Sequence, residues 1–263
     1  MHNKPVVLTI AGSDSSAGAG IQSDLKTFHN HGVYGVTVIT ALTSQNKKGV
    51  QSSFEVPAKI IKSQLISLLD DFNIRTAKTG MLSSSKVIEA VYGVLKDKKK
   101  LKLIIDPVLF SKNQFVMLDK NGIKSLINKL LPLAFLITPN FSEAEILTGI
   151  KFNTFEDMEL ACKILNDFGA KNVLIKGGHM TKNIGLPVAS DLLYSKNKFF
   201  IFPANYINTK HTHGIGCTFS AAIAAKIALG KKIEESIIES KIYVQNKLQR
   251  TEKIGSGINP VEI

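Results

Sequence analysis

The residues best suited to chemistry lie in one short segment, His213-Gly214-Ile215-Gly216-Cys217-Thr218, directly before an alanine-rich apolar stretch. Two glycines separated by one residue allow backbone N–H groups to point inward as a nest at a helix N-terminus, which binds phosphate or a developing anion without a Walker lysine. Cys217 would lie in the first helical turn, where the helix dipole lowers the pKa of a thiol and makes it a plausible base. A buried cysteine beside a tight turn is the other interpretation.

A second group of polar residues, Asn140 and Glu143, follows a predicted strand, Phe135–Thr138. Ligands of open α/β sheets bind beyond the carboxyl ends of the strands, where this pair would lie. A carboxylate and an amide there suit Mg²⁺ that is held partly through water and phosphate oxygens. Helix capping by Asn140 or Ser142, with Glu143 near the positive end of the helix, explains the same spacing equally well.

Other candidate residues also follow predicted strands. Asp106 comes directly after an apolar run and is a candidate metal or base position, or a turn residue. Glycine-rich loops at Gly12–Gly20 and Gly177-Gly178 would let backbone approach a small ligand closely. The standard nucleotide loops are absent, because Gly230-Lys231 is followed by lysine and Gly18-Ala19-Gly20 lacks its third glycine. Several weak signals at strand carboxyl ends together indicate one site.

These residues must be positioned by short apolar runs that alternate with amphipathic stretches. Continuous β-branched runs are typical of parallel strands that are buried on both faces. The predicted strands are Val6–Ile10, Val36–Leu42, Leu101–Ile105, Phe135–Thr138 and Val173–Lys176, with a separate β segment at Val50–Val56 and an antiparallel pair at Asp191–Tyr194 and Lys198–Phe202. The predicted helices are Ile21–Asn30, Ala58–Asp70, Lys86–Lys96, Ile123–Leu131, Glu143–Leu147, Phe155–Phe168, Cys217–Leu229 and Ile233–Leu248. This order predicts a single α/β domain over residues 1–263, a three-layer sandwich with a mostly parallel central sheet flanked by helices.

Charge is the unusual bulk property, at +12 with 33 basic residues that are all lysines except Arg75 and Arg250. Nucleic-acid readers usually exploit the guanidinium fork, so a lysine-rich surface that favours anionic ligands is the simpler interpretation, and a lysine-rich nucleic-acid binder is the alternative. The cysteines, Cys162 and Cys217, cannot staple a chain of 263 residues, and no Cys/His cluster has zinc spacing. The apolar stretches are too short for a membrane span, which predicts a reduced, cytoplasmic protein without membrane attachment.

Motifs along nearly the whole chain resemble those of the hydroxymethylpyrimidine/phosphomethylpyrimidine kinases, a family of the ribokinase-like superfamily. The order of the motifs, their spacing and their placement at strand ends all agree with that family. The matching segments are Thr9–Asp14, Gly18–Asp24, Val38–Leu42, Gln45-Asn46, Lys78–Leu82, Asp106–Val108, Thr138–Asn140, Lys176–His179, Asn208–Gly214 and Gly255–Val261.

The resemblance implies a ribokinase-like fold and two successive phosphorylations. The first would act on the hydroxymethyl group of 4-amino-5-hydroxymethyl-2-methylpyrimidine, and the second on the resulting monophosphate, whose diphosphate product supplies the pyrimidine half of thiamine. ATP, Mg²⁺ and a homodimer are implied as well, with no nucleic-acid partner. Pyridoxal kinase is the nearest alternative, since relatives with the same Gly-x-Gly-Cys ending phosphorylate that vitamer too. A degenerate relative that binds the pyrimidine without phosphorylating it is a further alternative.

The same resemblance implies roles for individual residues. Cys217 would accept the hydroxymethyl proton while the amides of Gly214 and Gly216 hold the transferring phosphoryl group. The residues that would lie near the pyrimidine are Gly12, Asp24, Gln45, Met81 and Val108. The residues that would lie on the nucleotide side are Asn140, Glu143 and Lys176, and those that would organise Mg²⁺ are Asp106 and Glu143.

Three positions depart from the pattern of the family. Ile215 stands where the family commonly has threonine between the two glycines, so a hydroxyl is lost while the backbone amide remains. Asn113-Gln114 stand where the family often has Ser-Gly, in a loop expected to hold phosphate. Ala17 replaces a frequent glycine, which is a mild change unless the backbone there requires a positive φ.

Overall fold

The computed structural model describes residues 4–46, 48–111, 113–178, 184–187, 189–204, 207, 209 and 212–249. Within these residues, nine strands form one sheet in the order β3-β2-β1-β4-β5-β6-β7-β8-β9. Neighbouring strands from β2 to β7 pair in parallel, whereas β3 at one edge and β8 and β9 at the other pair antiparallel. The strands are β1 (Val6–Asp14), β2 (Tyr34–Asn46), β3 (Gly49–Glu55), β4 (Thr76–Thr79), β5 (Lys102–Ile105), β6 (Ala134–Ile137), β7 (Asn172–Lys176), β8 (Asp191–Ser195) and β9 (Lys198–Phe202).

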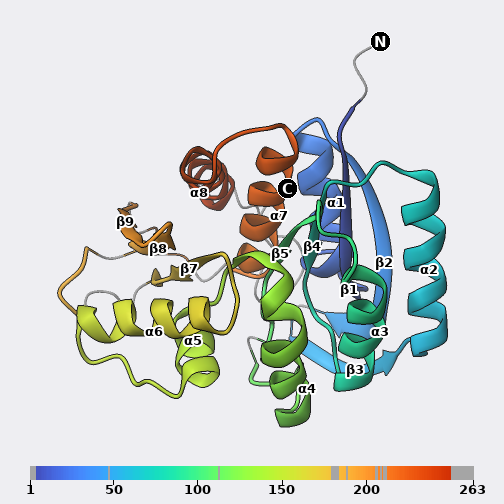
Figure 1. Cartoon of the computed structure of the whole chain (residues 1–263), viewed down its shortest axis with the longest axis horizontal. Coiled ribbons are helices and arrows are strands. Elements are labelled where there is room, and N and C mark those ends of the chain that lie inside the picture. Colours follow the sequence, from blue (N-terminus) through green and yellow to red (C-terminus); the bar gives the residue numbers. More distant parts are fainter. Residues whose placement is uncertain are drawn as a thin grey trace.

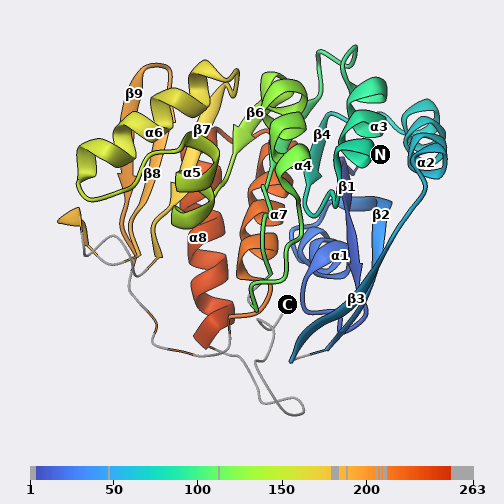
Figure 2. The same cartoon turned by 90° about the horizontal axis from the view of Figure 1, so that it is seen from below.

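Helices cover both faces of this sheet (Figure 1 and Figure 2). One face carries α1 (Gly20–Asn30), α7 (Ile215–Ala228) and α8 (Ile233–Gln249), with α7 in contact with both of the others. The opposite face carries α2 (Ala58–Asp71), α3 (Ser85–Leu95), α4 (Lys120–Ser125), α5 (Phe141–Thr148) and α6 (Phe155–Asp167). The predicted three-layer sandwich with a mostly parallel sheet is therefore confirmed.

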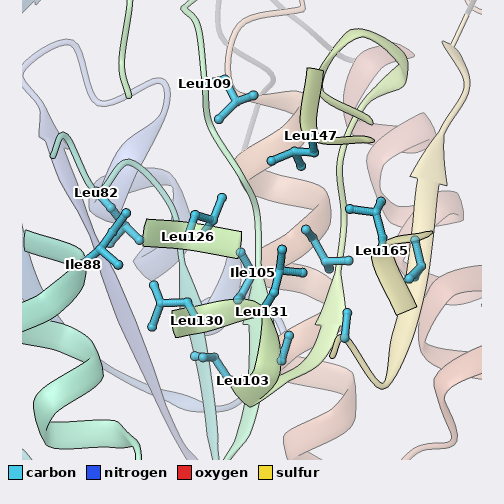
Figure 3. Close-up of a cluster of buried hydrophobic side chains, with 14 of the residues drawn as sticks. Leu82, Ile88, Leu103, Ile105, Leu109, Leu126, Leu130, Leu131, Leu147 and Leu165 are labelled. Carbon is cyan, nitrogen blue, oxygen red and sulfur yellow. The ribbon is translucent and has the colours of Figure 1, made fainter. Parts of the chain in front are cut away.

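Side chains alternate along the central strands between two apolar cores. In β5, Leu103 and Ile105 enter the core on the side of α2 to α6, while Ile104 enters the core on the side of α7. Figure 3 shows the first of these cores, where Leu126 and Leu130 gather with the β5 side chains. Complete burial of one such side chain stabilises the fold by about 1.5–3 kcal/mol. Burial on both faces explains why the strands read as continuous apolar runs.

The one central strand absent from the predictions is β4 (Thr76–Thr79), which lies between β1 and β5. Its sequence, Thr-Ala-Lys-Thr, has no apolar run, yet all of its residues are buried. The buried amine of Lys78 is paired with the carboxylate of Asp24 on α1 at 2.9 Å. Because an internal ion pair replaces apolar packing here, hydrophobic patterning could not reveal this strand.

Two other elements differ from their predicted form. β2 is longer than predicted and forms a hairpin with β3, so the separate β segment predicted at Val50–Val56 is an edge strand of the main sheet. The helix predicted at Ile123–Leu131 is irregular: α4 ends at Ser125 and continues as a π-helical turn and a short 3₁₀ turn around Pro132. Proline has no N–H to donate, so regular α-helical hydrogen bonding cannot continue through Pro132. Among the described residues, no helix is long and apolar enough to cross a membrane.

Candidate active site

A cavity of about 230 Å³ opens at the edge of the sheet where the parallel strands end. Residues at the carboxyl ends of β1 and β7 and residues that follow β4, β5 and β6 line it, and the N-terminal turn of α7 completes its wall. The residues predicted for the site that do line this cavity are Gly12, Gln45, Met81, Asp106, Val108, Asn140, Glu143, Lys176, Gly214, Gly216 and Cys217. The general rule that ligands bind beyond the carboxyl ends of the strands thus locates most of the site.

Asp24 is the predicted site residue that the structure places elsewhere. It is completely buried and does not line the cavity. Its carboxylate accepts hydrogen bonds from Thr9 Oγ1 at 2.5 Å and from Lys78 Nζ at 2.9 Å. The predicted contact between Asp24 and the pyrimidine is therefore corrected to a structural ion pair that links α1 to β4.

The glycine-rich segment forms the start of α7. Gly214 is the N-cap residue with φ of +80°, so a side chain there would be strained, and a Cβ atom would also collide with the carbonyl oxygen of Gly18. The helix begins at Ile215, two residues earlier than predicted, which places Gly216 and Cys217 within the first turn. The residues of that turn line the cavity, and the first turn of a helix leaves N–H groups without intrahelical partners, as an anion-binding helix N-terminus requires.

The environment of the Cys217 thiol raises its pKa, whereas the sequence predicted a lowered pKa. Burial raises the pKa of Cys217 to about 11, although nearby Lys78 and an N–H donated by Gly20 favour the thiolate. The carboxylates of Asp24 and Asp106 reinforce the upward shift. The prediction that this pKa is lowered is therefore wrong for the ligand-free protein, because desolvation by burial and two nearby carboxylates raise it.

Asp106 and Lys176 form an ion pair in the wall of the cavity, with Lys176 Nζ 2.9 Å from Asp106 Oδ1. Ser220 Oγ on α7 donates to the other carboxylate oxygen at 3.2 Å. Burial opposes the charge on both groups, but their mutual attraction lowers the pKa of Asp106 and raises the pKa of Lys176. The pair places a fixed cation next to the nest, where a phosphate group would need one.

Asn140 and Glu143 form a reciprocal capping box at the start of α5. Asn140 Oδ1 accepts from the backbone N–H of Glu143 at 2.9 Å, and Glu143 Oε2 accepts from the backbone N–H of Asn140 at 2.8 Å. The predicted capping role is thus confirmed, and both residues also line the cavity. Burial, together with the carboxylate of Asp106, raises the pKa of Glu143 to about 7 even though Lys176 opposes the shift.

The donor set near Glu143 fits a magnesium ion that is held mostly by water and phosphate. Glu143 and Asp106 are buried carboxylates whose negative charges repel each other. A bound cation would offset this repulsion. Among the described residues, no group of three or more His, Cys, Asp or Glu side chains is arranged to hold a metal ion by itself. Mg²⁺ usually keeps several waters and uses one or two carboxylates plus substrate phosphates, so this limited set is sufficient.

Among the residues of the cavity wall that had no predicted role in the site are Asp14 at the end of β1 and His213 before the nest. His213 Nε2 lies 3.0 Å from Asp14 Oδ2 and 3.2 Å from the side-chain amide of Gln45. Asp14 was visible in the sequence as a carboxylate in the glycine-rich loop that follows the predicted strand Val6–Ile10. His213 was visible as the first residue of the segment around the nest, but its contacts with Asp14 and Gln45 could not be predicted because these residues are distant in sequence.

The three departures from the family pattern all have structural consequences. Ile215 lines the cavity between the two glycines. Ala17 has φ of +58° and Gln114 has φ of +62°, so each adopts the left-handed conformation in which glycine is favoured. The backbone at residue 17 therefore does adopt a positive φ, so the replacement of glycine by Ala17 is not a mild change. Lys112, which precedes Asn113, lies outside the described residues.

We expect Ala17→Gly to stabilise the protein, by roughly 0.5–1 kcal/mol, because glycine removes the left-handed strain at a modest entropic cost. Ala144→Gly within α5 is the control and should cost about 1 kcal/mol or more, since helix interiors disfavour glycine. Urea denaturation of both variants measures the free energies of unfolding. Destabilisation by Ala17→Gly would contradict the strain that we assign to this loop.

A three-layer α/β sandwich with an anion nest at the N-terminus of α7 and a lysine–aspartate pair beside it defines a ribokinase-like small-molecule kinase. The family model for phosphomethylpyrimidine kinase matches residues 14–262. The chain belongs to the hydroxymethylpyrimidine/phosphomethylpyrimidine kinase family. The Haemophilus influenzae hydroxymethylpyrimidine/phosphomethylpyrimidine kinase is 42% identical over 260 residues, which cover 99% of this chain and 97% of that protein.

Solved structures agree with this assignment. The chain is similar to phosphomethylpyrimidine kinase from Clostridium difficile 630, with a TM-score of 0.81 and 42% identity over 92% of this chain and 99% of that chain. It is also similar to Staphylococcus aureus pyridoxal kinase in complex with AMP-PCP and pyridoxal, with a TM-score of 0.87 and 34% identity over 99% of this chain and 94% of that chain. The predicted family and fold are therefore confirmed, and the protein is a kinase.

Proposed function

We propose that the enzyme transfers the γ-phosphoryl group of ATP to the hydroxymethyl oxygen of 4-amino-5-hydroxymethyl-2-methylpyrimidine, and then phosphorylates the monophosphate to the diphosphate that thiamine biosynthesis uses. The observation that carries this proposal is one cavity with two different walls. One wall offers an amide and apolar side chains for a ring, from Gln45, Met81 and Val108. The other offers the nest, Cys217 and the Asp106–Lys176 pair for phosphate chemistry.

The pyrimidine wall suits a small, flat, polar-edged ring. Met81 packs with Ala41 and Met117 as a small apolar cluster, against which Val108 lies. Gly12 leaves room beside Met81, because a Cβ atom at that position would approach the Met81 sulfur to 3.0 Å. Apolar faces with a few directed polar groups are typical of small-molecule sites, and Gln45 supplies the directed group here.

The phosphate wall supports the transfer step. The hydroxymethyl oxygen forms a bond to the γ-phosphorus, the bond to the β-γ bridging oxygen breaks to release ADP, and the hydroxyl proton passes to the thiolate form of Cys217. The N–H groups at the start of α7 and the ammonium of Lys176 stabilise the phosphoryl oxygens as their charge changes. Glu143, Asn140 and Asp106 would hold Mg²⁺, which neutralises phosphate charge when it is bound.

We expect Gln45→Ala to raise KM for the pyrimidine about tenfold or more, while KM for ATP changes little. The alanine removes the directed hydrogen bonds to the ring and leaves the phosphate wall intact, and one buried hydrogen bond corresponds to about this factor. Steady-state kinetics with each substrate varied in turn measure both constants. Gln51→Ala, on the exposed face of β3, is the control and should leave both unchanged. An equal rise in both constants would place Gln45 outside the pyrimidine wall.

Pyridoxal kinase is the second candidate activity, supported by the 34% identity and TM-score of 0.87 with the Staphylococcus aureus enzyme bound to AMP-PCP and pyridoxal. Pyridoxal also carries a hydroxymethyl group on a nitrogen heterocycle, so the fold and Cys217 would serve it equally. ATP-dependent phosphorylation of both compounds, compared side by side as kcat/KM, decides between them. Preference for the pyrimidine with accumulation of a diphosphate supports our proposal, and preference for pyridoxal overturns it.

We further propose that residues 1–263 act as a single cytoplasmic kinase domain that assembles as a homodimer. The continuous sheet from β3 to β9 supports one domain, and the resemblance to the family supports the dimer. Sedimentation equilibrium measures the assembly state, for which a mass near twice 28.7 kDa is expected.

A further inference from the structure

His213 lies between the side chains of Asp14 and Gln45, and both contact its Nε2 atom. The Asp14 carboxylate needs a hydrogen-bond donor there, whereas the NH₂ group of Gln45 needs an acceptor. The His213 Nε2 atom is 3.0 Å from Asp14 Oδ2 and 3.2 Å from the side-chain amide of Gln45. All three residues line the cavity that we assign to the pyrimidine. A neutral imidazole nitrogen either donates or accepts, so the state of Nε2 decides which end of the Gln45 amide faces it.

Asp14 determines that state. Its Oδ1 accepts from the backbone N–H and the hydroxyl of Ser16, both at 2.8 Å, and its Oδ2 accepts from the backbone N–H of Ala19 at 2.8 Å. Burial opposes ionisation, but hydrogen bonds from His213 and Ser16 outweigh it and lower the pKa of Asp14. A carboxylate held this way can only accept, so His213 Nε2 carries the hydrogen and donates it.

The Gln45 carboxamide stands with Nε2 facing His213 Nε2 at 3.2 Å and with Oε1 facing Thr43 Oγ1 at 3.3 Å. Two N–H donors cannot satisfy each other, so the carboxamide must be turned by 180°, which brings its carbonyl oxygen to His213 and its NH₂ group to Thr43. Thr43 can accept from it, because its own hydroxyl hydrogen goes to the carbonyl oxygen of Ser13 at 2.9 Å. Ser15 Oγ bonds both the N–H and the carbonyl of the Gln45 backbone, which holds this residue in place.

We propose that His213, held by Asp14, fixes the direction of the Gln45 carboxamide and so makes the site selective for a ring edge with an amino donor beside an acceptor nitrogen. This inference rests on the proposed function. A carbonyl oxygen and an N–H in fixed places complement a 4-aminopyrimidine, which offers an amino donor and an unprotonated ring nitrogen. A 4-oxopyrimidine offers the reverse pattern, with a carbonyl acceptor beside a ring N–H. An amide that is free to rotate by 180° would accept both.

The test compares kcat/KM for 5-hydroxymethyl-2-methylpyrimidine bearing either a 4-amino or a 4-oxo group. We expect the wild type to prefer the amino compound by about tenfold or more. The oxo compound would place a carbonyl against the carbonyl of the Gln45 amide and a ring N–H against its NH₂ group, so these buried groups would lack hydrogen-bond partners. His213→Phe frees the amide and should lower this preference about tenfold, mainly through KM for the pyrimidine. Asp14→Asn presents an N–H to His213, lets Nε2 become the acceptor and should shift the preference toward the oxo compound. His29→Phe, on the exposed end of α1, is the control and should leave the preference unchanged.

A ¹⁵N NMR spectrum of the histidine rings in the ligand-free protein provides a second readout that does not depend on activity. We expect the hydrogen of His213 on Nε2 in the wild type, and a hydrogen on Nδ1 alone would overturn the proposal. An unchanged preference in His213→Phe would also overturn it while leaving the proposed function intact. A wild type that phosphorylates neither pyrimidine would overturn the proposed function and this selectivity together, whatever the tautomer of His213.

Discussion

Replacing Cys217 by serine is expected to lower kcat by about 10²–10⁴-fold, the usual contribution of a general base, while KM for the pyrimidine stays nearly constant. Serine preserves the size and position of the side chain in the first turn of α7 but is a far weaker acid than a thiol, so it cannot serve as an anionic base near neutral pH. Steady-state kinetics measure both constants. An unchanged kcat would remove Cys217 from the proton transfer.

The pH dependence of kcat distinguishes a base from a residue that only shapes the nest. With burial raising the pKa of Cys217 to about 11, the thiol is protonated at neutral pH and its thiolate fraction increases as the pH rises toward that value. The kcat of the wild type should therefore increase with pH over the neutral and alkaline range, and the Cys217→Ser variant should lose this increase. Cys162→Ser is the matched control, because Cys162 is a buried residue of α6 in the apolar core and its replacement should leave the profile unchanged.

Asp24→Leu is expected to have the largest effect on stability, a loss of about 3–5 kcal/mol in the free energy of unfolding. Burial disfavours the charge on Lys78, but the Asp24 carboxylate outweighs it and raises the pKa of Lys78. Removal of the carboxylate leaves a cation with no exposed side-chain surface and no anion in contact. Urea denaturation gives the free energy of unfolding of each variant.

The double variant Asp24→Leu with Lys78→Met should recover most of that loss, because it replaces the whole ion pair by apolar groups of similar length. Lys151→Met is the surface control, since the Lys151 side chain is 81% exposed in its pair with Glu145 and should change stability little. If the double variant were as unstable as Asp24→Leu alone, the loss would come from packing and not from an unpaired buried charge.

The features of the fold that depend on apolar burial could be predicted from the sequence. Strands such as β5 and β7 are buried on both faces and read as continuous apolar runs. Helix starts with capping boxes were visible too, as at Thr154 before α6. β4 could not be predicted, because its burial depends on the pairing of Lys78 with a residue 54 positions earlier in the chain.

In the site, too, features that depend on local sequence could be predicted, and features that depend on distant residues could not. Residues at or directly after strand ends, such as Lys176 and Asp106, were found because the carboxyl ends of parallel strands meet at one edge. The raised pKa of Cys217 and the burial of Asp24 depend on which charges surround each group in three dimensions. The contact of His213 with Asp14 joins residues 199 positions apart, so the local motif around His213 could not reveal it.

The packing of α7 against the first strands has a consequence for the order in which the protein acquires activity. This helix contacts β1, β4 and β5, yet it is synthesised after all nine strands of the sheet. A nascent chain that ends before Gly214 contains the ring-binding wall but no nest and no Cys217. Contacts of such long sequence separation form slowly, and phosphoryl transfer needs α7 in place, so the recovery of activity during refolding cannot precede the docking of α7.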